Sequence, residues 1–174
     1  IFVMGAASAA NVTLYYTPTC PHCHHAREFI GNTLAYEYDN LKVEAVNVLE
    51  PDNRPAFEET LKKCMFEFGG VPVIVVGEKC FQGYGPGMDE SFREAIAVDM
   101  SDSDKAAAAA NRKAMTTDAD GFKAAHSDRA NIIIERVAGA DQKKNSDSNP
   151  VMYFYILLAV LVVGLGFIVL KKKK

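Results

Sequence analysis

The feature that most constrains this chain is a pair of cysteines, Cys20 and Cys23, placed directly after a short apolar strand pattern over residues 12–16. Pro21 suits the first position of a helix, so Cys20 lies where a strand ends and a helix begins. The unpaired N–H groups and the positive dipole end of such a helix stabilise a thiolate at Cys20. Cys23 follows within one turn and is close enough to close a disulfide. The pattern predicts a redox-active pair of thiols.

Residues 11–98 show the periodicities of alternating strands and helices, and Val12, Leu14 and Tyr16 alternate on one face of the first strand. Gly69 and Gly70 end the second helix pattern, and Gly77-Glu78 suits the two-residue turn of a hairpin. The expected strands cover 12–16, 43–48, 71–76 and 79–82, and the expected helices cover 21–34, 53–68 and 88–96. The predicted order is therefore βαβαββα, an α/β domain.

Residues 151–170 form a run of 20 residues without a charge. As a helix such a run would be about 30 Å long, enough to cross a bilayer. Four lysines, 171–174, follow this run. On its N-terminal side, residues 141–150 contain two lysines and two aspartates, so their charges cancel. Because an excess of lysine marks the cytoplasmic side, we expect a transmembrane helix with the cysteine domain outside the cytoplasm and residues 171–174 as a cytoplasmic tail.

Residues 1–10 resemble the end of a signal peptide, with Ala7-Ser8-Ala9 as a cleavage site, although they also fit a ragged N-terminus. Four cysteines suit an oxidising compartment. We expect a bacterial or archaeal envelope rather than the endoplasmic reticulum. A net charge of −3 gives no reason to expect a nucleic-acid partner.

Residues 99–150 differ in composition from the segments on either side. They contain a five-alanine run, many Ser, Asp, Asn and Lys residues, and one short apolar cluster at 132–137. Residues 104–115 have helical propensity, but an alanine face buries little surface. We therefore expect 99–150 to be a tether between the domain and the membrane.

The βαβαββα order, Cys20-Pro21-His22-Cys23 after the first strand, and Val71-Pro72 at the third strand together resemble the thioredoxin fold over residues 11–98. The short first strand and the glycines of the last hairpin make the domain more similar to glutaredoxins. The resemblance implies that Cys20 attacks a disulfide and Cys23 resolves the mixed disulfide. It also implies that Pro72 is cis beside the pair and that the Val71 backbone pairs with an extended substrate segment. Protein thiols and disulfides would be the partners, with no cofactor beyond the redox disulfide and with an unidentified redox partner in the membrane.

The sequence departs from these families at several positions. Leu14 stands where many thioredoxins have a buried Asp, and Val71 stands where glutathione-binding glutaredoxins usually have Thr. Dependence on glutathione therefore stays open. The Pro21-His22 pair is the one found in periplasmic disulfide oxidases, which favours the oxidising direction, but the direction of electron flow also stays open.

Two other functions fit parts of the sequence. Cys20, Cys23 and His24 satisfy the C-x-x-C-H attachment motif of c-type haem, in an electron-transfer protein. A redox-inert thioredoxin-fold binding module is the other alternative. Zinc is not expected, because adding His25 would still crowd four ligands into six residues. We expect His24 and His25 to be exposed helix residues, and His22 to interact with the Cys20 thiolate.

Cys64 and Cys80 are a second pair of cysteines in the domain. They could form a structural disulfide, remain buried thiols or act as an accessory redox pair. The spacing does not decide between these states, because a disulfide depends on the separation of the two Cα atoms in space.

Overall fold

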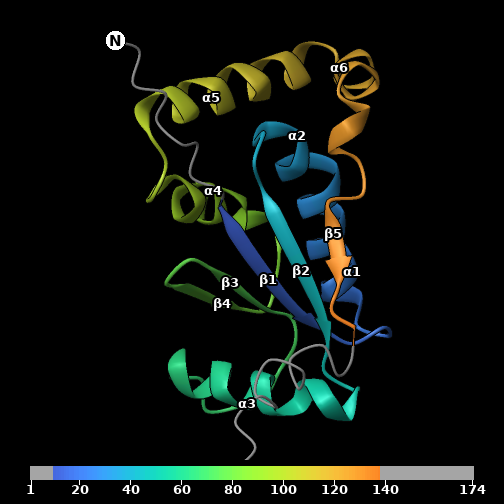
Figure 1. Cartoon of the computed structure of the whole chain (residues 1–174), viewed down its shortest axis with the longest axis vertical. Coiled ribbons are helices and arrows are strands. Elements are labelled where there is room, and N and C mark those ends of the chain that lie inside the picture. Colours follow the sequence, from blue (N-terminus) through green and yellow to red (C-terminus); the bar gives the residue numbers. More distant parts are fainter. Residues whose placement is uncertain (1–9, 138–174) are drawn as a thin grey trace, which may run out of the picture. The chain divides into compact units, whose positions relative to one another are not determined.

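The computed structural model describes residues 10–137 (Figure 1). The predicted transmembrane helix at 151–170, the lysine tail at 171–174 and all but the last residue of the predicted signal-peptide remnant at 1–10 lie outside the described residues. Within residues 10–137, no helix is long and apolar enough to cross a membrane.

The centre of the domain is a five-stranded mixed sheet with the strand order β4-β3-β1-β2-β5. The strands β1, β2 and β5 run parallel, whereas β3 is antiparallel to both β1 and β4. The strand bounds are β1 Asn11–Tyr16, β2 Lys42–Asn47, β3 Val73–Val76, β4 Lys79–Gln82 and β5 Ile133–Glu135.

Helices connect the strands and cover the sheet (Figure 1). Three short 3-10 turns precede α3, α4 and β5, at Pro51–Asn53, Pro86–Met88 and Ser127–Arg129. The helix bounds are α1 Pro21–Phe29, a π-helical turn Ile30–Leu34, α2 Ala35–Glu37, α3 Arg54–Lys63, α4 Asp89–Ala97, α5 Asp102–Thr117 and α6 Ala119–Ala125.

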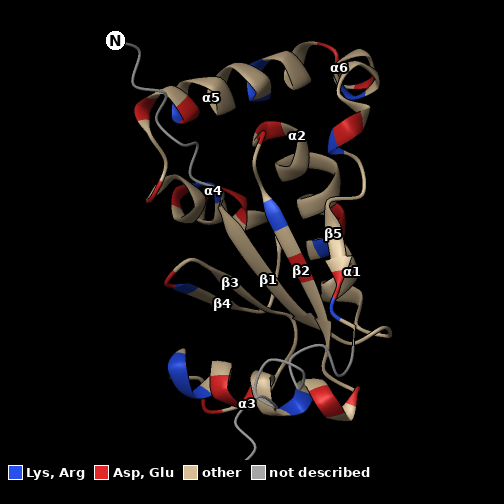
Figure 2. Ribbon diagram, viewed as in Figure 1, with Lys and Arg blue, Asp and Glu red and all other residues tan. Residues whose placement is uncertain are grey.

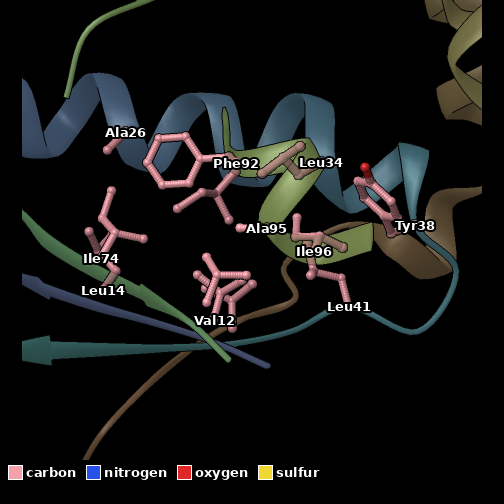
Figure 3. Close-up of a cluster of buried hydrophobic side chains, with 13 residues drawn as sticks. Val12, Leu14, Ala26, Leu34, Tyr38, Leu41, Ile74, Phe92, Ala95 and Ile96 are labelled. Atoms are coloured by element: carbon pink, nitrogen blue, oxygen red, sulfur yellow. The ribbon is translucent and has the colours of Figure 1, made fainter. Parts of the chain in front are cut away.

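Two apolar clusters pack on opposite faces of the sheet because alternate strand residues point to opposite sides. On one face, Val12 and Leu14 of β1 lie in one apolar cluster with side chains of α1 and α4 (Figure 3). Phe92 of α4 is fully buried in this cluster. On the other face, Tyr15 of β1 packs against Phe57 of α3. The alternation of β1 and the βαβαββα order predicted for residues 11–98 are confirmed.

The helix α3 ends earlier than predicted, at Lys63 instead of Phe68. Met65 adopts a left-handed conformation with φ 56°. The N–H of Phe66 then donates to the carbonyl of Leu61 at 2.9 Å, and the N–H of Met65 donates to that of Lys62 at 3.1 Å. This is the Schellman arrangement, and here it closes a helix without the usual glycine. Residues 64–72 consequently form a loop that leads to Pro72.

The prediction of a tether over residues 99–150 is wrong for the part that the structure describes. The helices α5 and α6 and the strand β5 belong to the domain, and β5 adds a fifth strand beside β2. Polar contacts fix them. Asn111 of α5 donates to the backbone carbonyl of Glu37 at 3.1 Å, and Arg129 donates to that of Tyr36 at 2.8 Å. Counting apolar residues missed these segments because only a few of their apolar side chains, such as Ala108 and Ile133, pack on the core, while polar side chains and backbone pairing supply the other contacts.

The described charges are mixed rather than sorted by sign. Blue and red segments occur together on α3 and on α5 in Figure 2, so neither helix carries charges of one sign alone. The charged side chains instead pair with one another, as at Arg93 and Glu37, whose Nε and Oε2 atoms are 2.7 Å apart.

Candidate active site

Cys20 forms the cap of α1, as the sequence predicts. Its backbone is extended, with φ −84° and ψ 113°, and Pro21 occupies the first turn of the helix. The backbone N–H of Cys23 donates to the sulfur of Cys20 at 3.2 Å. In the reduced protein this N–H and the helix dipole would stabilise a negative charge on the same sulfur.

The two cysteines are joined by a disulfide, and their Cα atoms are 5.2 Å apart. They differ in exposure. Cys20 is partly exposed, whereas Cys23 is buried, with 2% of its surface accessible. An incoming sulfur can therefore reach Cys20, while Cys23 is placed to react only with its neighbour. This asymmetry suits an attacking and a resolving thiol.

Val71 and Pro72 meet the cysteine pair from the other side of the site. The peptide bond between them is cis, as the resemblance implies, and Pro72 is buried. The carbonyl oxygen of Val71 lies 3.6 Å from the sulfur of Cys20, although the two residues are 51 positions apart. The N–H of Gly83 donates to the carbonyl of Pro72 at 2.8 Å and ties this turn to the end of β4.

The Val71 backbone is open to a further strand. Val71 is partly exposed, and within the described residues its N–H has no hydrogen-bond acceptor. A peptide lying across the site could use this N–H and the adjacent carbonyl, as a strand added to the edge of a sheet does.

The three histidines of α1 are all exposed, as predicted for His24 and His25. A ring nitrogen of His24 lies 2.8 Å from the carbonyl oxygen of Pro18, which fastens the loop before Cys20 to the helix. Across the described part of the chain, His22 makes no hydrogen bond through its ring. Its interaction with a Cys20 thiolate stays a prediction.

The haem alternative fits this geometry poorly. A haem attached to the same motif needs both sulfurs to face the macrocycle, but Cys23 is buried and His24 turns towards Pro18. Among residues 10–137, no group of three or more His, Cys, Asp or Glu side chains is arranged to hold a metal ion.

Cys64 and Cys80 form a second disulfide, with their Cα atoms 5.8 Å apart. This answers the question that the sequence left open for these residues. The bond joins the end of α3 to β4 across a sequence separation of 16. It encloses the loop that leads to Val71.

Sequence reasoning missed a polar group beside the site, because it comes from β5. One carboxylate oxygen of Glu135 accepts from the hydroxyl of Tyr16 at 2.9 Å, and the other pairs with Arg27 at 2.5 Å. Tyr16 ends the strand before the cysteines, and Arg27 lies on the helix after them. Burial and the hydrogen bond to Glu135 raise the pKa of Tyr16. No signal in residues 99–150 alone could have placed Glu135 there.

The segment after β4 carries another hydroxyl, that of Tyr84, which is partly buried. Tyr84 donates to Asp89 at 2.8 Å and stacks on Phe29 of α1. Burial, followed by the hydrogen bond to Asp89, raises the pKa of Tyr84. Asp89 is thus engaged within the protein.

The comparison with protein-family models agrees with a glutaredoxin-like domain. Residues 12–81 match the family model for glutaredoxin. Among solved structures, the chain is similar to a glutaredoxin from Archaeoglobus fulgidus at 26% identity, covering 50% of this chain and 86% of that one, with a TM-score of 0.39. A search of curated protein sequences finds no match. The family match supports a glutaredoxin-like domain of thioredoxin fold, and it ends before α4.

Proposed function

We propose that this protein is a membrane-tethered, extracytoplasmic thiol–disulfide oxidoreductase that exchanges disulfides with other proteins through Cys20 and Cys23. The glutaredoxin match over residues 12–81 supports the general class of activity. The observation that carries the proposal is the position of Cys20, which caps α1, accepts the N–H of Cys23 and lies 3.6 Å from the carbonyl of Val71.

In the reducing direction, the Cys20 thiolate attacks one sulfur of a substrate disulfide. A bond forms between Cys20 and that sulfur, and the other substrate sulfur leaves as a thiolate that takes up a proton. Cys23 then loses its proton and attacks Cys20, which releases the second substrate thiol and closes the Cys20–Cys23 disulfide. Two electrons pass from the protein to the substrate. In the oxidising direction the same steps run backwards.

Trapping the mixed disulfide tests this mechanism. A Cys23→Ser variant lacks the resolving thiol, so it should accumulate substrate proteins joined to Cys20. A Cys20→Ser variant should capture none. The adducts would be separated on non-reducing gels and identified by mass spectrometry. Retention of full exchange activity by both variants would overturn the proposal.

The membrane part of the proposal depends on the uncharged run at 151–170 and the lysines that follow it. The full-length chain should stay with membranes after alkaline carbonate extraction, whereas a chain ending at residue 150 should be released. A thiol reagent that cannot cross the membrane should label Cys20 of Cys23→Ser in intact cells. Release of the full-length chain would contradict the anchor, and labelling only after lysis would contradict the extracytoplasmic placement.

The direction of electron flow follows from the reduction potential of the Cys20–Cys23 couple. A value near that of the strongest known oxidant in this fold, about −120 mV, would make the protein a disulfide donor, and a value near about −270 mV would make it a reductant. We propose the oxidising direction, because the Pro21-His22 pair resembles that of disulfide oxidases. Equilibration with a defined dithiol buffer measures the potential.

A further inference from the structure

The loop of residues 64–72, here called the Val71 loop, joins α3 to β3 and carries Val71 to the cysteine pair. Two side chains of β4 hold it. Cys80 is bonded to Cys64 at the beginning of the loop. The side-chain amide of Gln82 donates to the carbonyls of Phe68 at 2.6 Å and Gly70 at 3.3 Å. Cys80 and Gln82 are two residues apart on β4, so they point to the same face of the sheet, where the loop lies.

The middle of the Val71 loop has few other contacts. Phe66 and Val71 at its two ends pack against the apolar cluster on the α3 side of the sheet. Between them all four residues, 67–70, are exposed, and the side chain of Phe68 is 75% accessible. Two of the four are glycines, which lose more conformational freedom on ordering than any other residue. Such a segment opens easily unless specific bonds restrain it.

The bonds from β4 therefore have a consequence at the reactive sulfur. The loop leads directly into Val71, whose carbonyl lies 3.6 Å from the sulfur of Cys20, so a shift of the loop would change the position of this carbonyl. An extended peptide that pairs with the Val71 backbone needs that position, because its own sulfur must arrive in line with the Cys20–Cys23 bond. A small thiol touches only Cys20 and does not need the loop.

We propose that Gln82 and the Cys64–Cys80 disulfide are positioning groups that make the site selective for thiols and disulfides carried on extended protein segments. They act through the Val71 loop and do not contact the reacting atoms. The inference rests on the proposed function and goes further, because it assigns preference for a protein substrate to two side chains of β4.

The test compares two thiols in a single turnover with the whole chain, in which the Cys20–Cys23 disulfide is oxidised in every variant and the wild type also keeps Cys64–Cys80. One probe is a ten-residue peptide with a single central cysteine, and the other is cysteamine. In each reaction the probe thiolate attacks the sulfur of Cys20 and forms a mixed disulfide, the Cys20–Cys23 bond breaks, and Cys23 leaves as a thiolate that takes up a proton. Acid quenching and mass spectrometry give the two rate constants.

The variants are Gln82→Met, the double variant Cys64→Ser/Cys80→Ser, and their combination. Gln82→Met keeps the length of an exposed side chain and removes its donor, so it should leave the fold intact. Lys79→Met, an exposed change on the same strand away from the loop, is the matched control. We expect Gln82→Met to slow the peptide reaction by about 3- to 10-fold, the size of one lost hydrogen-bonding group, and the combination to slow it further. The cysteamine reaction should change by less than about twofold.

Equal slowing of both probes, or no slowing of either, would overturn the inference while leaving the proposed function intact. A wild-type protein that reacts with neither probe would instead contradict the proposed function. Hydrogen exchange then decides the positioning role. The amides of residues 67–71 should exchange faster in Gln82→Met than in Lys79→Met, and equal exchange would exclude that role.

Discussion

Arg93 of α4 binds the carboxylate of Glu37 at the end of α2 through two hydrogen bonds of 2.7 Å each. Both side chains are largely removed from water, with 12% and 4% of their surfaces accessible. Arg112 of α5 approaches the same carboxylate at 4.0 Å and also pairs with Glu90. Hydrogen bonding to Glu37 raises the pKa of Arg93. This group of charged side chains joins α2 to α4 and α5.

Replacing Arg93 with Met should destabilise the protein by about 2–4 kcal/mol, because the Glu37 carboxylate would stay buried with only Arg112 nearby. Chemical denaturation followed by circular dichroism measures the change. Arg54→Met, at an exposed position in the first turn of α3, is the control and should change stability by less than about 0.5 kcal/mol. Similar losses in the two variants would mean that the Arg93–Glu37 pair has no special role.

The stability of the protein should fall on the alkaline side. Burial, and next the charge of Glu37, raise the pKa of Tyr38 from 10.0 to about 12. The unfolded chain therefore loses this proton at lower pH than the folded protein does. The contribution of the neutral phenol is complete below pH 10 and disappears as the pH rises towards 12. Tyr38→Phe should show a shallower loss across this window in denaturation curves measured at each pH, and an unchanged slope would contradict the assignment.

The Cys20 thiol should have a pKa well below the free value of about 8.5 in the reduced protein. The reason is local, because the N–H of Cys23 points at the Cys20 sulfur from 3.2 Å at the beginning of a helix. The ultraviolet absorbance of the thiolate, followed against pH in Cys23→Ser, gives the midpoint. His22→Gln should raise that midpoint if the imidazolium also stabilises the thiolate. A midpoint at or above the free value would refute the activation.

Residues 102–136 should resist trypsin in the native protein. Arg129 has 12% of its side chain accessible and is bound to Tyr36 and Asp39, and β5 is paired with β2. Cleavage after Arg112 and Arg129 should therefore need unfolding, and it should be faster in Arg93→Met. Mass spectrometry of timed digests locates the cuts. Rapid cleavage of wild-type protein at both residues would restore the interpretation of this segment as a tether.

Much of the fold followed from local patterns in the sequence. The alternation of Val12 and Leu14, the position of Pro21 and the hairpin turn at Gly77 each depend on a few neighbouring residues, and each prediction agrees with the structure. The end of α3 did not follow, because it depends on Met65 adopting a left-handed conformation that sequence patterns assign to glycine.

By itself the sequence determined that the cysteine pair lies at the beginning of a helix. The strand pattern before Cys20 and the proline after it fix the point at which the helix begins. Only the tertiary structure decided which distant groups meet there. Val71 lies beside Cys20, Gln82 holds the loop that carries Val71, and Glu135 reaches Tyr16 and Arg27 from a short apolar cluster in an otherwise polar segment. Such contacts depend on backbone pairing and on single polar side chains whose partners are far away in the chain. Periodicity detects buried apolar faces, and it cannot detect a hydrogen bond that closes only when the sheet is complete.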